Sequence, residues 1–521
     1  MEEFLAENNL HFIESEEKYR SVVTDVKIKK GTIIISSPAM GLVLMENARN
    51  NYCHTCLSLL KKNKSRCSRC KIAHYCSREC QVKAWKYGHK YTCKLWKEKK
   101  LFDNDIMDVD LLVQVVLKIC AGDVKDTSSS SNNTIKKSEV TGSMAPDKLK
   151  DITESQEALQ WKEKEDQINR EAFLSLMTHQ DKIEFEEWKY LRDMAKAVFL
   201  IAPDLESKTS ESELIQHLLR FKCNNFVYHD TQLFGMAESA FPVGSLFNHS
   251  CSPNATLYYH EGRQIVRAMR DIPRGEEICI TYTDVMNARP QRQQLLLQKY
   301  KFECRCFRCI DTSGLDKKLI SLKEEEEEDS QESKGKKEKE EEDFTYVENQ
   351  LNPDILSIHD VFDKEKCKML ASQLEGESSF ASYSLLKFIV IVAAKLLPLI
   401  DASDEEFYQA HREVVSIIDP LELKIFTQVC RYTYHCIDAN DYAHASVASF
   451  YVLMAYLVFL DRYHPLTGLQ WLTFAKLIWN RGDDYRTEAV QSLHFAKTAI
   501  MIAEGRSDVL EEIENLIQQF N

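Results

Sequence analysis

Residue types that bind metals are concentrated in one stretch of the chain. Seven of the seventeen cysteines lie between Cys53 and Cys93, and His89 lies among them. They form four closely spaced pairs: CHTC (53–56), CSRC (67–70), Cys76 with Cys80, and His89 with Cys93. Two soft ligands a few residues apart can hold one tetrahedral zinc ion from a tight turn. Eight such ligands therefore predict two closed, structural zinc sites.

A second group of cysteines is one ligand short of a zinc site. CRCFRC (304–309) supplies three thiols, from Cys304, Cys306 and Cys309. Cys251 lies far away, in the polar segment GSLFNHSCSPNAT (244–256), and its position predicts that it completes a third four-cysteine site. The alternatives are a spare thiol or a nucleophile paired with His249, because residues two apart on a strand face the same side. No third group that would orient such a pair is evident.

The surrounding sequence indicates several folded units joined by polar segments. The chain has 521 residues and 44% hydrophobic content, enough for two to four compact units. The stretch 321–343 holds twelve acidic residues and five lysines, a net of −7 out of −14 for the chain, and predicts a solvated linker. A serine-rich stretch at about 123–155 is also predicted to be disordered.

Between these breaks the residue periodicity changes. Charge-rich helices are predicted over about 156–220, and a β-rich region over about 226–282 contains a hairpin around a Glu-Gly turn. Beyond 349 the pattern is helical, with a capping box at Ser403 and Glu406. The last helices, 442–463, 468–479, 487–503 and 507–520, suggest either tetratricopeptide-like hairpins or an ordinary antiparallel bundle.

Two features bear on the cellular setting. The opening MEEFLAENNL is acidic and does not look like a secretory leader, which favours zinc in a reducing compartment over disulfides. The most apolar run, 445–460, is short for a membrane span and is predicted to be a buried helix. We therefore expect no membrane partner.

The order of the first cysteine cluster, with YCSREC, HKYTC and an intervening Trp85, resembles the MYND zinc finger. The resemblance implies interleaved pairing: one zinc on Cys53, Cys56, Cys76 and Cys80, and the other on Cys67, Cys70, His89 and Cys93. This module contains a group of basic residues: Lys61, Lys62, Lys64, Arg66, Arg69 and Lys71. They form either a solvated basic face or a weak patch that binds nucleic acid or an acidic partner.

NHSCSPN, followed by GEEICITYTD and YKFECRCFRC, resembles the core of a SET domain with its post-SET zinc motif. With the inserted finger and the helical C-terminal part, the chain resembles the SET and MYND domain-containing protein-lysine methyltransferases. This implies an α+β multidomain fold with these parts: 1–50 N-terminal SET, 51–95 MYND finger, 96–220 helical insert with a disordered segment at 123–155, 221–286 core SET, 287–312 post-SET zinc motif, 313–348 acidic disordered linker, and 349–521 tetratricopeptide-like helical domain.

The resemblance implies methyl transfer from S-adenosylmethionine to a lysine of a histone or non-histone protein, with three zinc ions as structural metals. Tyr282 would be the catalytic tyrosine and would also contact the cofactor. The other implied cofactor contacts are Asn248, His249, Phe302 and Asn224. Phe226 and Tyr300 would line the lysine channel. The alternative is that these aromatic residues only pack in the hydrophobic core.

Two departures from the family pattern are visible. The family usually places a glycine in the first cofactor-binding turn, where this chain has Lys18, Tyr19 and Arg20; Lys18 or Arg20 could pair with the cofactor carboxylate. Glycines that usually precede NHSC are replaced in MAESAFP (236–242). The competing function is an adaptor with a degenerate SET domain that binds proline-rich or acidic partners through the finger. We expect a monomer located in nucleus and cytoplasm.

Overall fold

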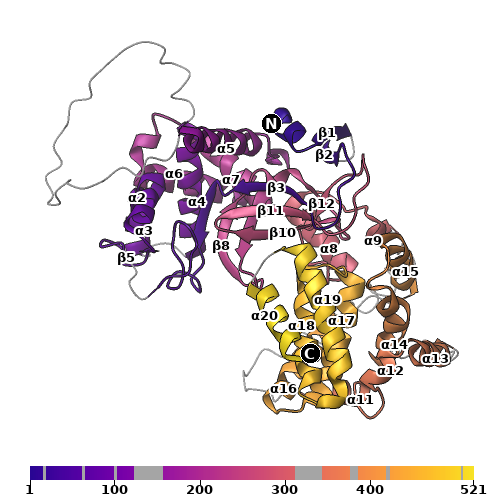
Figure 1. Ribbon diagram of the computed structural model, residues 1–521. Coiled ribbons are helices and arrows are strands. Elements are labelled where there is room, and N and C mark those ends of the chain that lie inside the picture. The colour runs from indigo at the N-terminus through magenta and orange to yellow at the C-terminus, as the bar shows by residue number, and fades with distance from the viewer. Residues whose placement is uncertain are drawn as a thin grey trace, which may run out of the picture.

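A computed structural model shows a β-rich body with helices on both sides (Figure 1). The described residues are 1–15, 19–61, 65–98, 103–121, 156–310, 343–375, 385–417, 423–505 and 508–520. The predicted disordered segment 123–155, the linker over 313–342 and Lys18 lie outside the described residues. The predicted α+β multidomain class is confirmed.

The body is built from small sheets that bring distant segments together. One sheet has the order β10-β11-β3 and another β4-β8-β7, and β9 pairs in parallel with β12. The strands are β1 (Leu10–Ser15), β2 (Tyr19–Thr24), β3 (Ile33–Pro38), β4 (Gly41–Leu44), β7 (Asn225–His229), β8 (Gly235–Ala240), β9 (Asn248–His249), β10 (Ala255–His260), β11 (Arg263–Ala268) and β12 (Cys279–Ile280). The predicted hairpin is β10-β11, whose turn residues Glu261 and Gly262 have φ of 48° and 75°. Positive φ at both positions matches the twist of a two-residue hairpin loop.

The finger lies between β4 and the helical insert. Its elements are β5 (Ser65–Arg66), β6 (His74–Tyr75), α2 (Arg78–Ala84), a short π-helical turn (Trp85–His89) and α3 (Lys90–Glu98). Ser77 caps α2 by accepting a hydrogen bond from the backbone N–H of Cys80 at 3.2 Å. Gly88, with φ of 135°, separates the end of α2 from α3. The finger elements and the C-terminal helices lie at opposite ends of the molecule in Figure 1.

The insert delivers the chain to β7. Its helices are α4 (Asp103–Cys120), α5 (Gln156–Leu174), α6 (Phe185–Ile201) and α7 (Glu211–Asn224). A capping box between Ser210 and Glu213 starts α7. Because β7 begins directly after α7, the CNNF segment lies at the junction of the helix with the sheet.

The C-terminal part is helical, as predicted. After α8 (Arg289–Leu295) and α9 (Phe307–Ile310), the helices are α11 (Thr345–Gln350), α12 (Ile358–Phe362), α13 (Lys364–Glu375), α14 (Leu385–Leu396), α15 (Asp404–Ile417), α16 (Leu423–Asp438), α17 (Tyr442–Phe459), α18 (Pro465–Trp479), α19 (Arg486–Ala503) and α20 (Asp508–Phe520). The helical part therefore begins inside the region predicted as linker, because α11 starts at Thr345. The capping box of Ser403 and Glu406 is confirmed. The tetratricopeptide-like reading stays a prediction.

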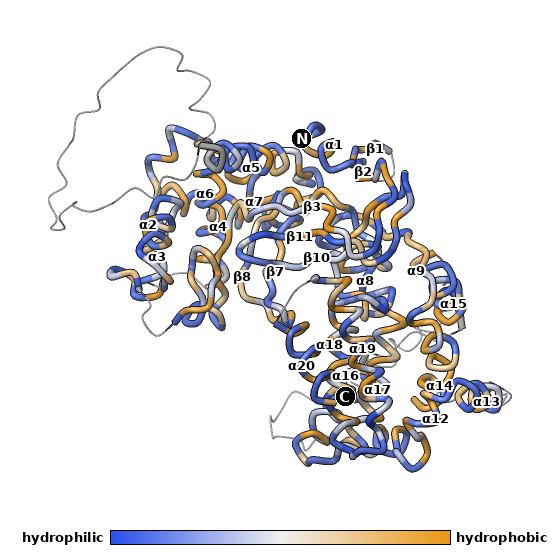
Figure 2. Tube along the Cα trace, in the orientation of Figure 1, coloured by the Kyte–Doolittle hydropathy of each residue, from blue (hydrophilic) through white to orange (hydrophobic). Residues whose placement is uncertain are grey.

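Apolar helices form the core of this part. Figure 2 shows α14 as a hydrophobic segment, and most of its side chains are buried. Among the described helices α17 has the length and hydropathy of a membrane span, and 72% of it is buried within the protein. At Gly468 of α18 an added Cβ would lie 2.7 Å from the Ile500 side chain of α19, so glycine permits this close helix packing. The predicted buried helix is thus confirmed.

Charged side chains join the helical part to the body. The carboxylate of Asp404 accepts hydrogen bonds from Lys30 Nζ at 3.0 Å, Arg462 Nη2 at 2.5 Å and the backbone N–H of Asp271 at 2.9 Å. Lys30 and Asp271 belong to the body, whereas Asp404 and Arg462 belong to the helical part. This network gives the helical part a defined orientation beside the site described next.

Candidate active site and metal centres

Three groups of ligand atoms are closed enough for zinc. In the described part of the chain, the members of each group lie within 4.8 Å of one another. The groups are Cys53, Cys56, Cys76 and Cys80; Cys67, Cys70, His89 and Cys93; and Cys251, Cys304, Cys306 and Cys309. Zinc bonds to sulfur of about 2.3 Å separate two tetrahedral ligands by roughly 3.8 Å, whereas a disulfide would bring the sulfurs to about 2.05 Å. The sulfur–sulfur and sulfur–nitrogen separations of 3.5 to 3.9 Å in these groups fit zinc, so the chain holds sites for three zinc ions.

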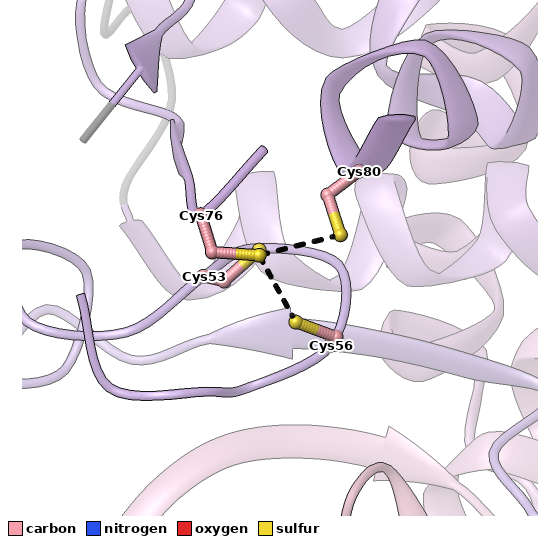
Figure 3. A group of neighbouring side chains, drawn as sticks. All are labelled: Cys53, Cys56, Cys76 and Cys80. Atoms are coloured by element: carbon pink, nitrogen blue, oxygen red, sulfur yellow. Dashed lines mark hydrogen bonds between the residues drawn. The ribbon is translucent and has the colours of Figure 1, made fainter. Parts of the chain in front are cut away.

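The first finger group draws its ligands from loops and a helix. The four sulfurs point toward one another, with Cys80 coming from the first turn of α2 (Figure 3). Sγ of Cys56 lies 3.5 Å from Sγ of Cys76, which lies 3.6 Å from Sγ of Cys80. The Ser77 cap fixes the start of α2 and therefore the position of Cys80.

The second finger group has mixed ligands. Sγ of Cys67 lies 3.7 Å from Sγ of Cys93, and Sγ of Cys70 lies 3.6 Å from Nε2 of His89. The bend at Gly88 lets His89 and Cys93, on successive helical segments, face the CSRC loop. The two groups use alternate pairs along the sequence, which is the interleaved arrangement implied by the MYND resemblance.

The third group answers the question raised by Cys251. Its Sγ lies 3.9 Å from Sγ of Cys304 and 3.7 Å from Sγ of Cys309, although more than fifty residues separate these positions. Cys251 is fully buried. Hydrogen bonds with the other three thiols raise the pKa of Cys251, because four buried thiols cannot all ionise without a cation among them.

The nucleophile alternative for Cys251 is disfavoured by the same geometry. Nε2 of His249 lies 3.3 Å from the sulfur, but Nδ1 of His249 accepts the backbone N–H of Tyr282 at 2.9 Å. A neutral imidazole that accepts at Nδ1 carries its proton at Nε2 and donates it to the sulfur. Such a ring cannot act as the base toward the thiol. Burial also lowers the pKa of His249 to about 4, which keeps the ring neutral.

Two buried arginines that sequence reasoning missed lie against this third group. Arg292 Nε is 3.2 Å from Sγ of Cys251, and Arg308 donates to the backbone carbonyls of Cys251, Val285 and Phe459 at 2.8, 3.0 and 2.8 Å. Burial lowers the pKa of Arg308 to about 10. A zinc ion with four thiolates carries two net negative charges, and these guanidinium groups offset them. Arg308 could have been noticed in the sequence, because it lies between two of the cysteines of CRCFRC.

Asn248 and His249 occupy β9, beside β12. The amide of Asn248 donates to the carbonyl oxygen of Arg20 at 2.6 Å and to Oε1 of Glu277 at 2.8 Å. The backbone N–H of Ser250 donates to the carbonyl oxygen of Ile280 at 2.9 Å. The NHSC segment is therefore held between the first strands and the ITYTD segment, so residues from three parts of the SET-like sequence meet here.

Tyr282 follows β12 and points back to the NHSC segment. Its hydroxyl donates to the carbonyl oxygen of Phe247 at 2.6 Å. Burial raises the pKa of Tyr282, so the hydroxyl stays protonated at neutral pH. Because the hydroxyl proton is used in the hydrogen bond to the Phe247 carbonyl, the lone pairs of the tyrosine oxygen remain available to accept another hydrogen bond.

The predicted aromatic residues gather around Tyr282. Its ring centroid lies 4.8 Å from that of Tyr300, 5.4 Å from that of His249 and 6.5 Å from that of Phe302. The hydroxyl of Tyr300 donates to the carbonyl oxygen of Tyr282 at 3.3 Å. The structure therefore brings together four of the side chains that the resemblance implied.

The CNNF segment lies next to this cluster. Phe226 packs against the same apolar core as Tyr282, and Sγ of Cys223 donates to the carbonyl oxygen of Lys299 at 3.2 Å. The side-chain amide of Asn224 is turned toward its own helix and donates to the carbonyl oxygen of Arg220 at 2.8 Å. The channel role of Phe226 and the cofactor role of Asn224 stay predictions.

The turn that the resemblance implies for the cofactor has a glycine-like backbone without a glycine. Tyr19 has φ of 60°, a conformation that favours glycine, and its side chain is 62% exposed. Arg20 is half-buried, and its Nη1 donates to the hydroxyl of Ser175 at 3.2 Å. A broad hollow of about 710 Å³ opens beside this turn. The exposed Tyr19 is one of the residues that line this hollow.

The convergence of NHSC, ITYTD and the post-SET cysteines decides the family. A model of the SET domain matches residues 20–283, half of the chain. The chain belongs to the SET domain family. The match begins at Arg20 and ends just after Tyr282, so it spans both ends of the site.

Curated relatives agree with the SET and MYND resemblance. The chain is similar to the histone-lysine N-methyltransferase SMYD3 of Homo sapiens, with 28% identity over 57% of this chain and 60% of that protein. It is similar to the N-lysine methyltransferase SMYD2 of Homo sapiens, with 28% identity over 56% of this chain and 58% of that protein. The match to the histone-lysine N-methyltransferase ASHR1 of Arabidopsis thaliana has 25% identity and covers 97% of this chain and 94% of that protein. The chain thus aligns with less than two thirds of the length of the two SMYD relatives.

Proposed function

We propose that the chain is an S-adenosylmethionine-dependent protein-lysine N-methyltransferase. The observation that carries the proposal is the meeting of Asn248 and His249 on β9 with Tyr282, Tyr300 and Phe302. A protein that only binds partners does not need a tyrosine hydroxyl among these aromatic rings. The names of the relatives also favour the enzyme over the adaptor.

The residues fit a methyl-transfer site. S-adenosylmethionine supplies a methyl group on a positively charged sulfur. The sulfur is a good leaving group when the lone pair of an amine attacks the methyl carbon. The aromatic rings of Tyr282, Tyr300 and Phe226 exclude water and so favour the neutral amine, which is the form that can attack. The Tyr282 oxygen can accept a hydrogen bond from an N–H of that amine and so orient the amine lone pair. The tyrosine's own hydrogen bond goes to the backbone carbonyl of Phe247.

Cofactor residues are assigned on the same basis. Asn248 and His249 present the backbone of β9, and Phe302 offers a ring face for the adenine. Arg20 offers a positive charge beside the first turn. Lys18 lies outside the described residues, and its pairing with the cofactor remains part of the proposal.

Partners and location are proposed more broadly. The acceptor is a protein lysine, on a histone or another protein, and the protein acts as a monomer in nucleus and cytoplasm. The finger would bind a proline-rich peptide or make a weak nucleic-acid contact. In support, Arg69 lies with its guanidinium 5.2 Å from the Trp85 ring centroid, an exposed aromatic and cationic face.

The test uses purified full-length protein. Calorimetric titration with S-adenosylmethionine should show one binding site per chain. Incubation with methyl-labelled cofactor and a panel of histone and non-histone proteins should transfer label to lysine. Absence of cofactor binding would remove the enzyme function and make the adaptor the better conclusion.

A further inference from the structure

We propose that Arg270 is a positioning residue through which the helical part of the chain controls the affinity of the cofactor site. The inference rests on the proposed function and deepens it, because it says what regulates that site. Arg270 follows β11, and neither the sequence patterns nor the family resemblance gave it a role.

Arg270 lies where the body meets the helical part. Its guanidinium carbon is 5.8 Å from the centroid of the Tyr408 ring of α15. The hydroxyl of Tyr408 donates to the carboxylate of Asp461 at 2.6 Å, and Asp461 is buried. The residue next to Arg270, Asp271, donates its backbone N–H to the carboxylate of Asp404 at 2.9 Å. The arginine therefore contacts an aromatic ring that is bonded to a buried carboxylate, and both belong to the helical part.

Within the body, Arg270 forms an ion pair with Glu276. Nη2 of Arg270 is 2.5 Å from Oε1 of Glu276, and Nη1 is 3.3 Å from Oε2. Burial acts against the charge of Arg270, but the bonds to Glu276 and the negative charges of Glu276 and Asp461 together raise the pKa of Arg270. A pair with two parallel bonds has a defined geometry, so the position of Arg270 fixes that of the Glu276 carboxylate.

Asn254 connects Glu276 to the strands of the site. The buried side-chain amide of Asn254 donates to Oε1 of Glu276 at 3.0 Å and to the carbonyl oxygen of Glu277 at 2.8 Å. Its Oδ1 accepts the backbone N–H of Cys279, the first residue of β12, at 2.8 Å. Oε1 of Glu277 accepts from the side-chain amide of Asn248 at 2.8 Å. Hydrogen bonds and one peptide link thus join the partner of Arg270 to a residue proposed to bind the cofactor.

These contacts couple the two parts of the molecule energetically. A polar contact in a buried network is costly to leave unmade, because water does not readily replace the lost partner. A displacement of α15 that pulls on Arg270 is therefore opposed by the bonds that hold Asn254 and Asn248. By thermodynamic linkage, a ligand held by β9 must in turn stabilise the contact between Arg270 and α15.

The experiment is calorimetry of the full chain with S-adenosylmethionine. Arg270→Gln should weaken cofactor affinity by about fivefold to tenfold, and Arg270→Lys, which keeps the charge, should retain most of it. Asp461→Asn removes the buried charge of the helical part but keeps an oxygen for the backbone N–H of Tyr463. It should weaken affinity by about threefold. The double variant should lose no more than Arg270→Gln alone, because both changes act through one contact.

Amide hydrogen exchange gives a second measurement that needs no methyl acceptor. Saturating S-adenosylmethionine should slow exchange in α15 of the wild-type protein and should not do so in Arg270→Gln. Arg274→Gln changes an exposed arginine four residues further along the chain and should match wild type in both measurements. Thermal melting establishes that each variant is folded. If Arg270→Gln does not fold, Asp461→Asn and the exchange of the wild-type protein decide the question.

The outcomes separate this inference from the proposed function. Wild-type affinity in Arg270→Gln, additive losses in the double variant, or unchanged exchange in α15 when wild type binds the cofactor would each overturn the inference while the proposed function stands. Wild type that does not bind S-adenosylmethionine would defeat the proposed function itself, and this inference with it.

Discussion

The hydroxyl of Tyr282 donates its proton to the carbonyl oxygen of Phe247, the residue directly before Asn248, across 2.6 Å. This contact joins the segment after β12 to the segment before β9. It fixes the direction of the tyrosine hydroxyl without using the lone pairs of its oxygen. The proposed acceptor of the lysine N–H is therefore preorganised by the segment that we propose binds the cofactor.

Tyr282→Phe tests that relationship. The phenyl ring keeps its packing against Tyr300, with 4.8 Å between ring centroids, so the chain should stay folded and keep its cofactor affinity, although the Phe247 carbonyl loses its donor and the free energy of unfolding should fall by about 1 kcal/mol. Loss of one preorganised polar group should lower the methyl-transfer rate by on the order of a hundredfold. Single-turnover kinetics measures the rate, and calorimetry measures the affinity. Tyr434→Phe, at an exposed position of α16, is the matched control. A Tyr282→Phe enzyme as fast as wild type contradicts the assignment.

Metal content tests the third sulfur group. Wild-type protein should contain three zinc ions per chain by mass spectrometry of the metal. Cys251→Ser should contain about two, because three remaining thiolates without the fourth bind zinc far more weakly. Cys430→Ser changes a cysteine outside the three groups and should retain three. Three zinc ions in Cys251→Ser would exclude Cys251 as a ligand.

Arg308→Met tests how the helical part is held to the site. The substitution leaves the carbonyls of Cys251, Val285 and Phe459 without their buried donor. Unpaired buried carbonyls each cost about 1 kcal/mol or more, so the free energy of unfolding should fall by about 3 kcal/mol. Chemical denaturation measures this change. Arg412→Met, at an exposed position of α15, should change it by less than about 0.5 kcal/mol. A similar small change in Arg308→Met would show that Arg308 does not join the two parts.

His464→Asn tests the pH dependence of stability. Nδ1 of His464 accepts the backbone N–H of Leu466 and caps α18, and burial lowers the pKa of His464 to about 4. In the unfolded chain this pKa is about 6.5, so between pH 6.5 and 4 only the unfolded state binds the proton. Stability is therefore full above pH 6.5 and declines as the pH falls toward 4.

Asparagine keeps the cap but does not titrate. The loss of stability between pH 7 and pH 5 should be smaller in His464→Asn than in wild type by about 2 kcal/mol. Urea denaturation at the two pH values measures the difference. The rest of the chain is the same in both proteins, so the comparison isolates this histidine. Identical pH profiles would mean that His464 is not held neutral in the fold.

Local patterns in the sequence determined much of this protein. Ligands two to four residues apart, such as Cys53 with Cys56, necessarily share a turn, so their spacing predicts a metal site before any fold is known. The Glu261-Gly262 turn and the periodicity of the C-terminal helices are also local, and both were predicted correctly. The family resemblance supplied Tyr282 and Asn248, and the structure places them near each other.

Tertiary structure alone decided the contacts between distant segments. Cys251 meets Cys304 because β9 pairs with β12 and the chain then returns through α8, and no local spacing encodes that path. The partners of Arg308 include Phe459, about 150 residues away, and Arg220 reaches the hollow beside Tyr19 only after α7 has packed. The positions of backbone carbonyls and hollows cannot be inferred from the residue types of a segment. Their positions follow from which strands and helices pack together, and that is a property of the whole chain.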